Sequence, residues 1–71
     1  MAPDHPTLAV LTPRQEQILD CIAQGMTNRQ IGQHLGLAEQ TVKNAITGVL
    51  AALGVKRRVQ AAVYAATRAA S

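Results

Sequence analysis

The segment around Gly36 constrains the fold of this chain more than any other feature. Thr27 precedes it, with Gln30 three positions later, which is the arrangement of a capping box at a helix N-terminus. Gly36 is suited to ending that helix. A second helix is predicted to follow, with an inner face of apolar residues at helical spacing: Val42, Ile46, Val49, Leu50 and Leu53. The segment therefore predicts two helices joined by a tight glycine turn.

The same signals predict two further helices. Thr12 and Gln15 form a second potential capping box, Pro13 suits the first helical position, and Gly25 ends the helix. An alanine-rich segment near the end has high helix propensity. We expect an all-α domain of four helices over residues 11–71, with helices at about 13–24, 28–35, 39–52 and 59–69. Residues 1–10 contain two prolines and no helical periodicity, so they are predicted to form a flexible arm or linker.

The size and charge of the chain limit its class. Its 71 residues leave room for one small domain, and a formal charge of +3 modestly favours an anionic partner. The single cysteine, Cys21, excludes an internal disulfide and falls on an apolar helical face. There is no signal peptide and no long apolar stretch, so we expect a soluble cytoplasmic protein with no membrane partner.

A short helix, a glycine turn and a second helix that opens with polar residues form the pattern of a helix-turn-helix. In that motif the second helix lies in the major groove of DNA. Lys43, Asn44 and Thr47 are expected opposite the apolar face, with Gly48 and Ala51 keeping the surface low. Lysine can reach guanine, asparagine can pair with adenine, and threonine can touch a base edge or a thymine methyl group.

Other residues suit phosphate groups. Thr41 and the first amides of the helix that begins at Thr27 are predicted to face the DNA backbone. Arg57 stands at the start of the last helix, where a cation is unfavourable unless a phosphate partner is present. Taken one at a time, these residues also fit a solvated surface, and the basic run 56–58 fits an exposed loop.

Several short motifs stand together at characteristic spacing: Leu11-Thr12-Pro13-Arg14, Gly25 to Gly32, Leu35-Gly36-Leu37, Thr41-Val42-Lys43, Leu53-Gly54-Val55 and Arg58-Val59-Gln60-Ala61. Together they resemble the LuxR/GerE-type helix-turn-helix family over about residues 11–66. The resemblance implies a four-helix domain whose third helix reads double-stranded DNA and whose fourth helix mediates dimerisation. It implies a bacterial transcription regulator and no cofactor or metal.

The resemblance also implies roles for individual residues. Base contacts fall to Lys43, Asn44 and Thr47. Phosphate contacts fall to Thr27, Asn28, Thr41, Lys56 and Arg57. The dimer interface falls to Val59, Ala62, Val63 and Ala66.

This chain departs from the family pattern at several positions. Ala38 stands where Ser or Asp usually caps the third helix, and this loss costs about 0.5–2 kcal/mol of helix stability. Ala45 replaces a frequent histidine, and Ala52 replaces a frequent lysine or arginine that would contact phosphate. Gln15 replaces a frequent glutamate but keeps the capping box.

Two other functions compete with DNA recognition. A helix-turn-helix fold can bind a protein, such as a partner regulator or RNA polymerase. Alanines at positions 45, 51 and 52 favour this alternative, because they leave fewer basic residues on the surface. A module like region four of a sigma factor shares the motif, but the Leu53-Gly54-Val55 block and the short last helix disfavour it. An enzyme is not expected, because His5 and His34 lie far apart and no nucleophile stands with a base.

Overall fold

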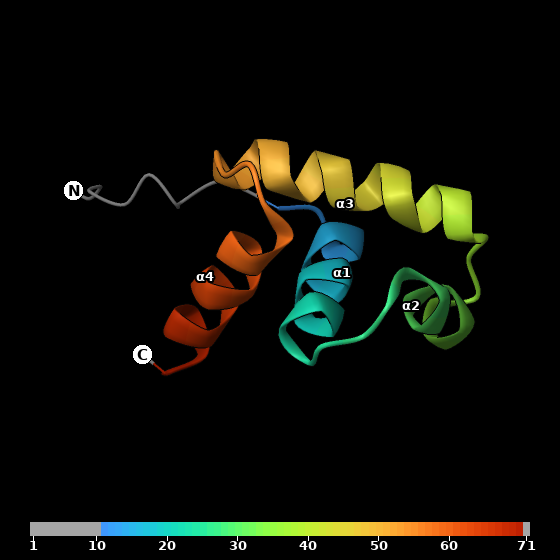
Figure 1. The fold of residues 1–71 in the computed structure, drawn as a ribbon, viewed down its shortest axis with the longest axis horizontal. Helices are drawn as coiled ribbons and strands as arrows, with labels where there is room; N and C mark the ends of the chain where they lie inside the picture. The colour runs from blue at the N-terminus through green and yellow to red at the C-terminus, as the bar shows by residue number, and fades with distance from the viewer. Residues whose placement is uncertain (1–10, 71) are drawn as a thin grey trace.

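A computed structural model describes residues 11–70 of the chain, so the arm expected over residues 1–10 lies outside the described residues. Across residues 11–70 the chain forms four helices and no strand, which confirms the predicted all-α class (Figure 1). The bounds of the helices are α1 Pro13–Ala23, α2 Asn28–Leu35, α3 Glu39–Leu53 and α4 Arg58–Ala70. Some ends differ by one residue from those expected: Gln24 is the C-cap of α1, for example, and α4 already begins at Arg58.

The two expected capping boxes are present. In the first, Thr12 Oγ1 accepts from Gln15 N at 3.1 Å, and Gln15 Oε1 accepts from Thr12 N at 2.9 Å. In the second, Thr27 and Gln30 make the same pair of hydrogen bonds at 3.1 and 2.8 Å. Each box satisfies two backbone amides that a helix N-terminus would otherwise leave without partners.

At the start of α4 a third glutamine, Gln60, makes one half of a capping box. Gln60 Oε1 accepts from the backbone amides of Lys56 at 2.9 Å and of Arg57 at 2.8 Å. The N-cap position, Arg57, has no side-chain oxygen that could return the bond. At α3 the N-cap is Ala38 and no side chain caps the helix, as its sequence predicts.

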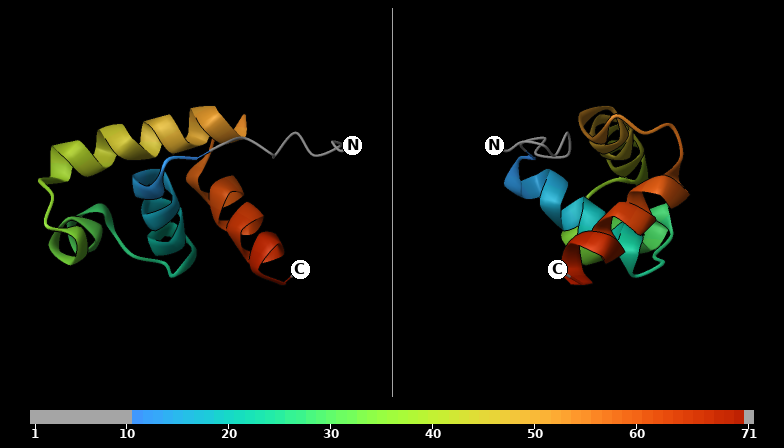
Figure 2. Two further views of the ribbon diagram at one scale, coloured as in Figure 1. Left: turned by 180° about the vertical axis from the view of Figure 1, so that it is seen from behind. Right: turned by 90° about the vertical axis from the view of Figure 1, so that its left-hand side faces the viewer.

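The long helix α3 lies across the other three helices, which stand side by side beneath it in the order α4, α1, α2 (Figure 1). It packs against all three, and α1 packs in addition against α4. Seen from behind and from the side, α3 keeps the same position at one edge of the molecule (Figure 2). One side of α3 therefore closes the core, and no helix among residues 11–70 covers the other.

The core forms where α1 meets its neighbours. Ile18 and Leu19 of α1 and Ile31 of α2 are fully buried, and α3 adds the buried residues Val42, Ile46 and Val49. Leu50 and Leu53, which were also expected inside, are half-buried and pack against this core. Cys21 is buried among these residues. Burial raises the pKa of its thiol, and the nearby Asp20 carboxylate raises it by a smaller amount.

The half-buried Tyr64 of α4 packs against the core, but the described residues of this helix that are fully enclosed in it are small, Ala61 and Ala65. Because alanine buries little apolar area, this contact alone gives limited stability. Arg68 adds an ion pair to Glu16 of α1 at 2.8 Å and a longer one to Asp20 at 3.6 Å. These side chains are partly exposed, so the pairs contribute about 0–1 kcal/mol.

The turn between α2 and α3 depends on two glycines. Gly36 ends α2 in the left-handed conformation, with φ of +71°. Gly32 is buried, and its carbonyl accepts from Leu37 N at 2.8 Å. A Cβ atom at Gly32 would lie 2.6 Å from the Leu37 carbonyl oxygen, so the turn closes directly over the helix.

We predict opposite effects for alanine at two helical glycines. Gly32→Ala is expected to lower the free energy of unfolding by about 1–3 kcal/mol, because the new methyl group meets backbone that cannot move aside. Gly48→Ala is the matched control, since a Cβ there has an ordinary 3.5 Å contact with Gln15 Nε2. It is expected to raise stability by about 0.5–1 kcal/mol through helix propensity. Urea denaturation measures both changes, and equal effects at the two positions would contradict the close turn.

We also predict that Ala38→Ser stabilises the domain by about 1 kcal/mol. Ala38 has the extended backbone of an N-cap residue, with φ −68° and ψ 149°, but offers no acceptor to the α3 amides. The control is Ala51→Ser at an exposed position in the last turn of α3, where serine is expected to cost about 0.5 kcal/mol. Thermal unfolding followed by circular dichroism compares them, and a loss of stability in both variants would count against a missing cap.

Candidate nucleic-acid interface

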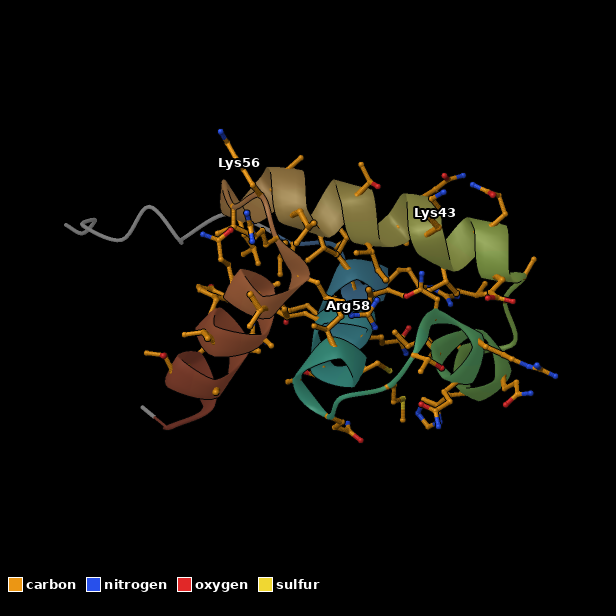
Figure 3. All side chains as sticks on the ribbon, in the orientation of Figure 1. Lys43, Lys56 and Arg58 are labelled. Carbon is orange, nitrogen blue, oxygen red and sulfur yellow. The ribbon has the colours of Figure 1, made fainter. Side chains whose placement is uncertain are left out.

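The exposed side of α3 carries the residues predicted to contact bases. Lys43, Asn44 and Thr47 are all exposed, whereas Val42, Ile46 and Val49 on the opposite side are buried. Lys43 lies in the N-terminal half of the helix (Figure 3). The helical period thus brings the three polar side chains onto the face that no described helix covers.

Two hydrogen bonds restrict what this face can offer a ligand. Asn44 Oδ1 accepts from Gln40 Nε2 at 3.1 Å, one helical turn earlier. Thr47 Oγ1 donates to the Lys43 carbonyl at 3.2 Å. The Asn44 amide therefore keeps both N–H donors and one lone pair of its oxygen, and Thr47 keeps acceptor capacity and its methyl group.

Two residues next to this face differ from the sequence-based expectation. Gln40 was not singled out, although it is exposed and bonded to Asn44. Its place four positions before Asn44 is the signal that could have identified it. Gly48 was expected on the outer surface but is half-buried, because that side of α3 turns toward Gln15 of α1.

The predicted phosphate-contacting residues occupy three places. Thr27 and Asn28 lie at the start of α2, and Thr41 is exposed in the first turn of α3. Lys56 and Arg57 are exposed in the connection between α3 and α4. The Lys56 side chain extends away from the helices beside the C-terminal end of α3 (Figure 3). Candidate phosphate contacts therefore flank both ends of the exposed face.

Arg58 does not lie in an exposed loop, as the basic run 56–58 suggested. It is the first residue of α4 and is half-buried. Its Nη1 donates to Asn28 Oδ1, and its Nη2 donates to the backbone carbonyl of Met26. Its spacing from Ala61 and Ala65, the buried face of α4, is the signal that could have identified it.

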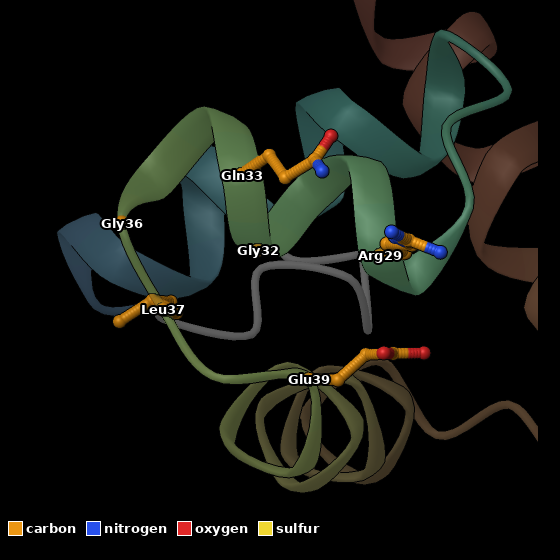
Figure 4. A pocket seen from close by; sticks show the side chains of 6 residues that line it. All are labelled: Arg29, Gly32, Gln33, Gly36, Leu37 and Glu39. Atoms are coloured by element: carbon orange, nitrogen blue, oxygen red, sulfur yellow. The ribbon is translucent and has the colours of Figure 1, made fainter.

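A shallow hollow lies between α2 and the start of α3 (Figure 4). Arg29 projects from α2 and Glu39 from the first turn of α3, on the same side of this hollow. Because their charges are opposite, the hollow has no net preference for an anion or a cation. The other residues that line it are Gly32, Gln33, Gly36 and Leu37.

The outer side of α4 carries a strip of apolar residues. Val59 and Val63 are 63% and 60% exposed, and Ala66 is also exposed, whereas Ala62 is half-buried. The four residues predicted for a dimer interface therefore follow one another along α4, with the two valines as its largest exposed apolar side chains.

No group of three or more histidine, cysteine or carboxylate side chains among the described residues could hold a metal ion. None of the helices over that part of the chain is long and apolar enough to cross a membrane.

Comparison with known proteins places this fold. Residues 9–65 match the family model GerE, described as bacterial regulatory proteins of the luxR family. The DNA-binding transcriptional activator DevR/DosR of Mycobacterium tuberculosis is 47% identical over 58 residues, which are 82% of this chain and 27% of that protein.

Two further relatives agree with this match. The transcriptional regulatory protein LiaR of Bacillus subtilis is 51% identical over 55 residues, 78% of this chain and 26% of its own length. The nitrate/nitrite response regulator protein NarL of Escherichia coli K12 is 44% identical over 54 residues, 76% of this chain and 25% of its own length. The chain therefore spans about a quarter of the length of these curated relatives.

Proposed function

Since the chain belongs to the luxR family of bacterial regulatory proteins, we propose that it binds double-stranded DNA and regulates transcription, with α3 in the major groove. The observation that carries this proposal is the uncovered face of α3, with Lys43, Asn44 and Thr47 exposed together. Such a regulator acts in the bacterial cytoplasm, where the DNA lies. It needs no catalytic residue and no cofactor.

The free hydrogen-bonding groups on α3 match base edges in the major groove. The Lys43 ammonium group can donate to O6 and N7 of guanine. Asn44 keeps both amide donors and one lone pair of Oδ1, so it can still pair with N6 and N7 of adenine while bound to Gln40. The Thr47 methyl group suits contact with the methyl group of thymine.

Phosphate contacts on both sides of α3 would fix its register on the duplex. Lys56 and Arg57 supply positive charge at one end, and each cation that neutralises a phosphate adds about 0.9 to the salt slope of binding. Thr27, Asn28 and Thr41 supply uncharged donors at the starts of α2 and α3. In this proposal the neutral contacts orient the domain, and the cations provide most of the attraction.

In this proposal two copies of the chain form a dimer through the apolar strip on α4. Packing Val59, Ala62, Val63 and Ala66 against a second copy would remove the two exposed valines from water. The small alanines allow the two helices to approach closely. Two-fold symmetry would then place two α3 helices on half-sites about one helical turn apart.

We predict that Lys43→Ala and Asn44→Ala each weaken binding to selected target DNA by about 1–3 kcal/mol, because each removes a base contact. Target sequences are first obtained by sequencing fragments of genomic DNA that the chain retains at moderate salt. Fluorescence anisotropy with a retained fragment then measures the affinities.

The control is Arg14→Ala, which removes one exposed positive charge from α1 and none of the predicted contact residues. It is expected to keep nearly full affinity. If the chain is folded and binds no DNA even at low salt, the proposal is wrong. Capture of a partner regulator or RNA polymerase that survives Lys43→Glu would then favour a protein-binding module.

For the dimer we predict that Val63→Glu abolishes cooperative binding to two adjacent half-sites and leaves binding to a single half-site nearly intact. A buried, unpaired carboxylate at the interface would oppose association of the two copies. The matched control Gln17→Glu adds the same charge at an exposed position of α1. Sedimentation of the protein–DNA complexes measures the stoichiometry, and unchanged cooperativity in Val63→Glu would exclude this face of α4.

A further inference from the structure

Arg58 connects elements that are distant in the sequence. It begins α4, and its guanidinium group reaches the loop between α1 and α2 as well as the first residue of α2. Its terminal nitrogen Nη2 donates to the Met26 backbone carbonyl, and its other terminal nitrogen, Nη1, donates to Asn28 Oδ1. These bonds span thirty-two and thirty residues of chain, so Arg58 fixes the start of α4 against the start of α2 (Figure 3).

The two partners of Arg58 are neutral. Both ion pairs found within the described part of the chain belong to Arg68, which binds Glu16 and Asp20. Within the described residues, two carbonyl dipoles therefore stabilise the charge of Arg58, and no carboxylate pairs with it.

The bond to Arg58 also determines the orientation of the Asn28 carboxamide. A carboxamide has an accepting oxygen and a donating nitrogen at its two ends. Because Oδ1 faces the guanidinium group, the Nδ2 end is turned away from Arg58. A DNA phosphate has only acceptors, so this is the orientation that phosphate binding requires.

We propose that Arg58 is a positioning residue for DNA binding: it holds the Asn28 carboxamide with its N–H donors directed to a phosphate, and it does not touch the DNA itself. This inference rests on the proposed function. Its neighbour Arg57 is exposed and binds phosphate directly, so two adjacent arginines have different roles. The Met26 contact supports Arg58 in this role, because it anchors the loop that leads into the Thr27 cap.

The test is a double-mutant cycle on DNA binding. Arg58→Met, Asn28→Ala and the double variant of the 71-residue chain are titrated with a short mixed-sequence DNA duplex at several salt concentrations. Circular dichroism confirms that each variant is folded at the temperature used. Arg57→Met is the matched control, since it removes the same group one residue away.

We expect each single variant to bind about five-fold more weakly, as for the loss of one hydrogen bond. The double variant should bind no more weakly than either single variant, because Arg58 acts through Asn28. The salt slope should be unchanged in Arg58→Met and should fall by about one in Arg57→Met.

Additive losses would overturn the inference, because Arg58 would then act independently of Asn28. A reduced salt slope in Arg58→Met would overturn it as well, since Arg58 would then touch a phosphate. If Arg58→Met does not fold, Arg58→Lys decides: lysine keeps the charge but lacks the fork that reaches both carbonyl groups. That variant should bind more weakly with an unchanged slope, and wild-type affinity would contradict the role. Absence of DNA binding by the wild-type chain would instead refute the proposed function.

Discussion

Only one side of α3 can be buried in a core this small, and the rest of the structure depends on that constraint. Val42, Ile46 and Val49 recur with the helical period, so packing them against α1 and α2 turns the residues between them outward. Polar side chains collect on that outer face because it gains nothing from contact with the core. The same packing that stabilises the domain therefore exposes Lys43 and Asn44 on the uncovered side of the helix.

A small core also explains how α4 is held. Its buried residues are two alanines, which fit closely against α1 but contribute little apolar area. Polar contacts supplement them at both ends of the helix: Arg58 bonds to the α1–α2 loop and to α2, and Arg68 pairs with α1. The larger apolar residues, Val59 and Val63, remain outside. Because alanines occupy the buried positions of α4, its valines stay exposed and could contact a second copy.

Local signals in the sequence predicted most of the fold. Capping boxes at Thr12 and Thr27 and the period of the apolar residues depend on neighbours within one or two helical turns, and both features are confirmed. Contacts between distant segments could not be predicted in this way. The bond from Arg58 to Asn28 joins residues thirty positions apart, and its formation depends on how α4 settles against α1. The roles of Lys43, Asn44 and Thr47 stay predictions, since burial establishes their exposure and not their ligand.

The most direct test of the central claim is an amide NMR titration of the chain with a short DNA duplex. The account predicts shift changes concentrated at Lys43, Asn44 and Thr47 and at the start of α2, with little change on the buried side of α1. Those residues lie on the uncovered face of α3 and beside it. Changes restricted to α4 and absent from α3, in a folded protein that binds the duplex, would contradict it.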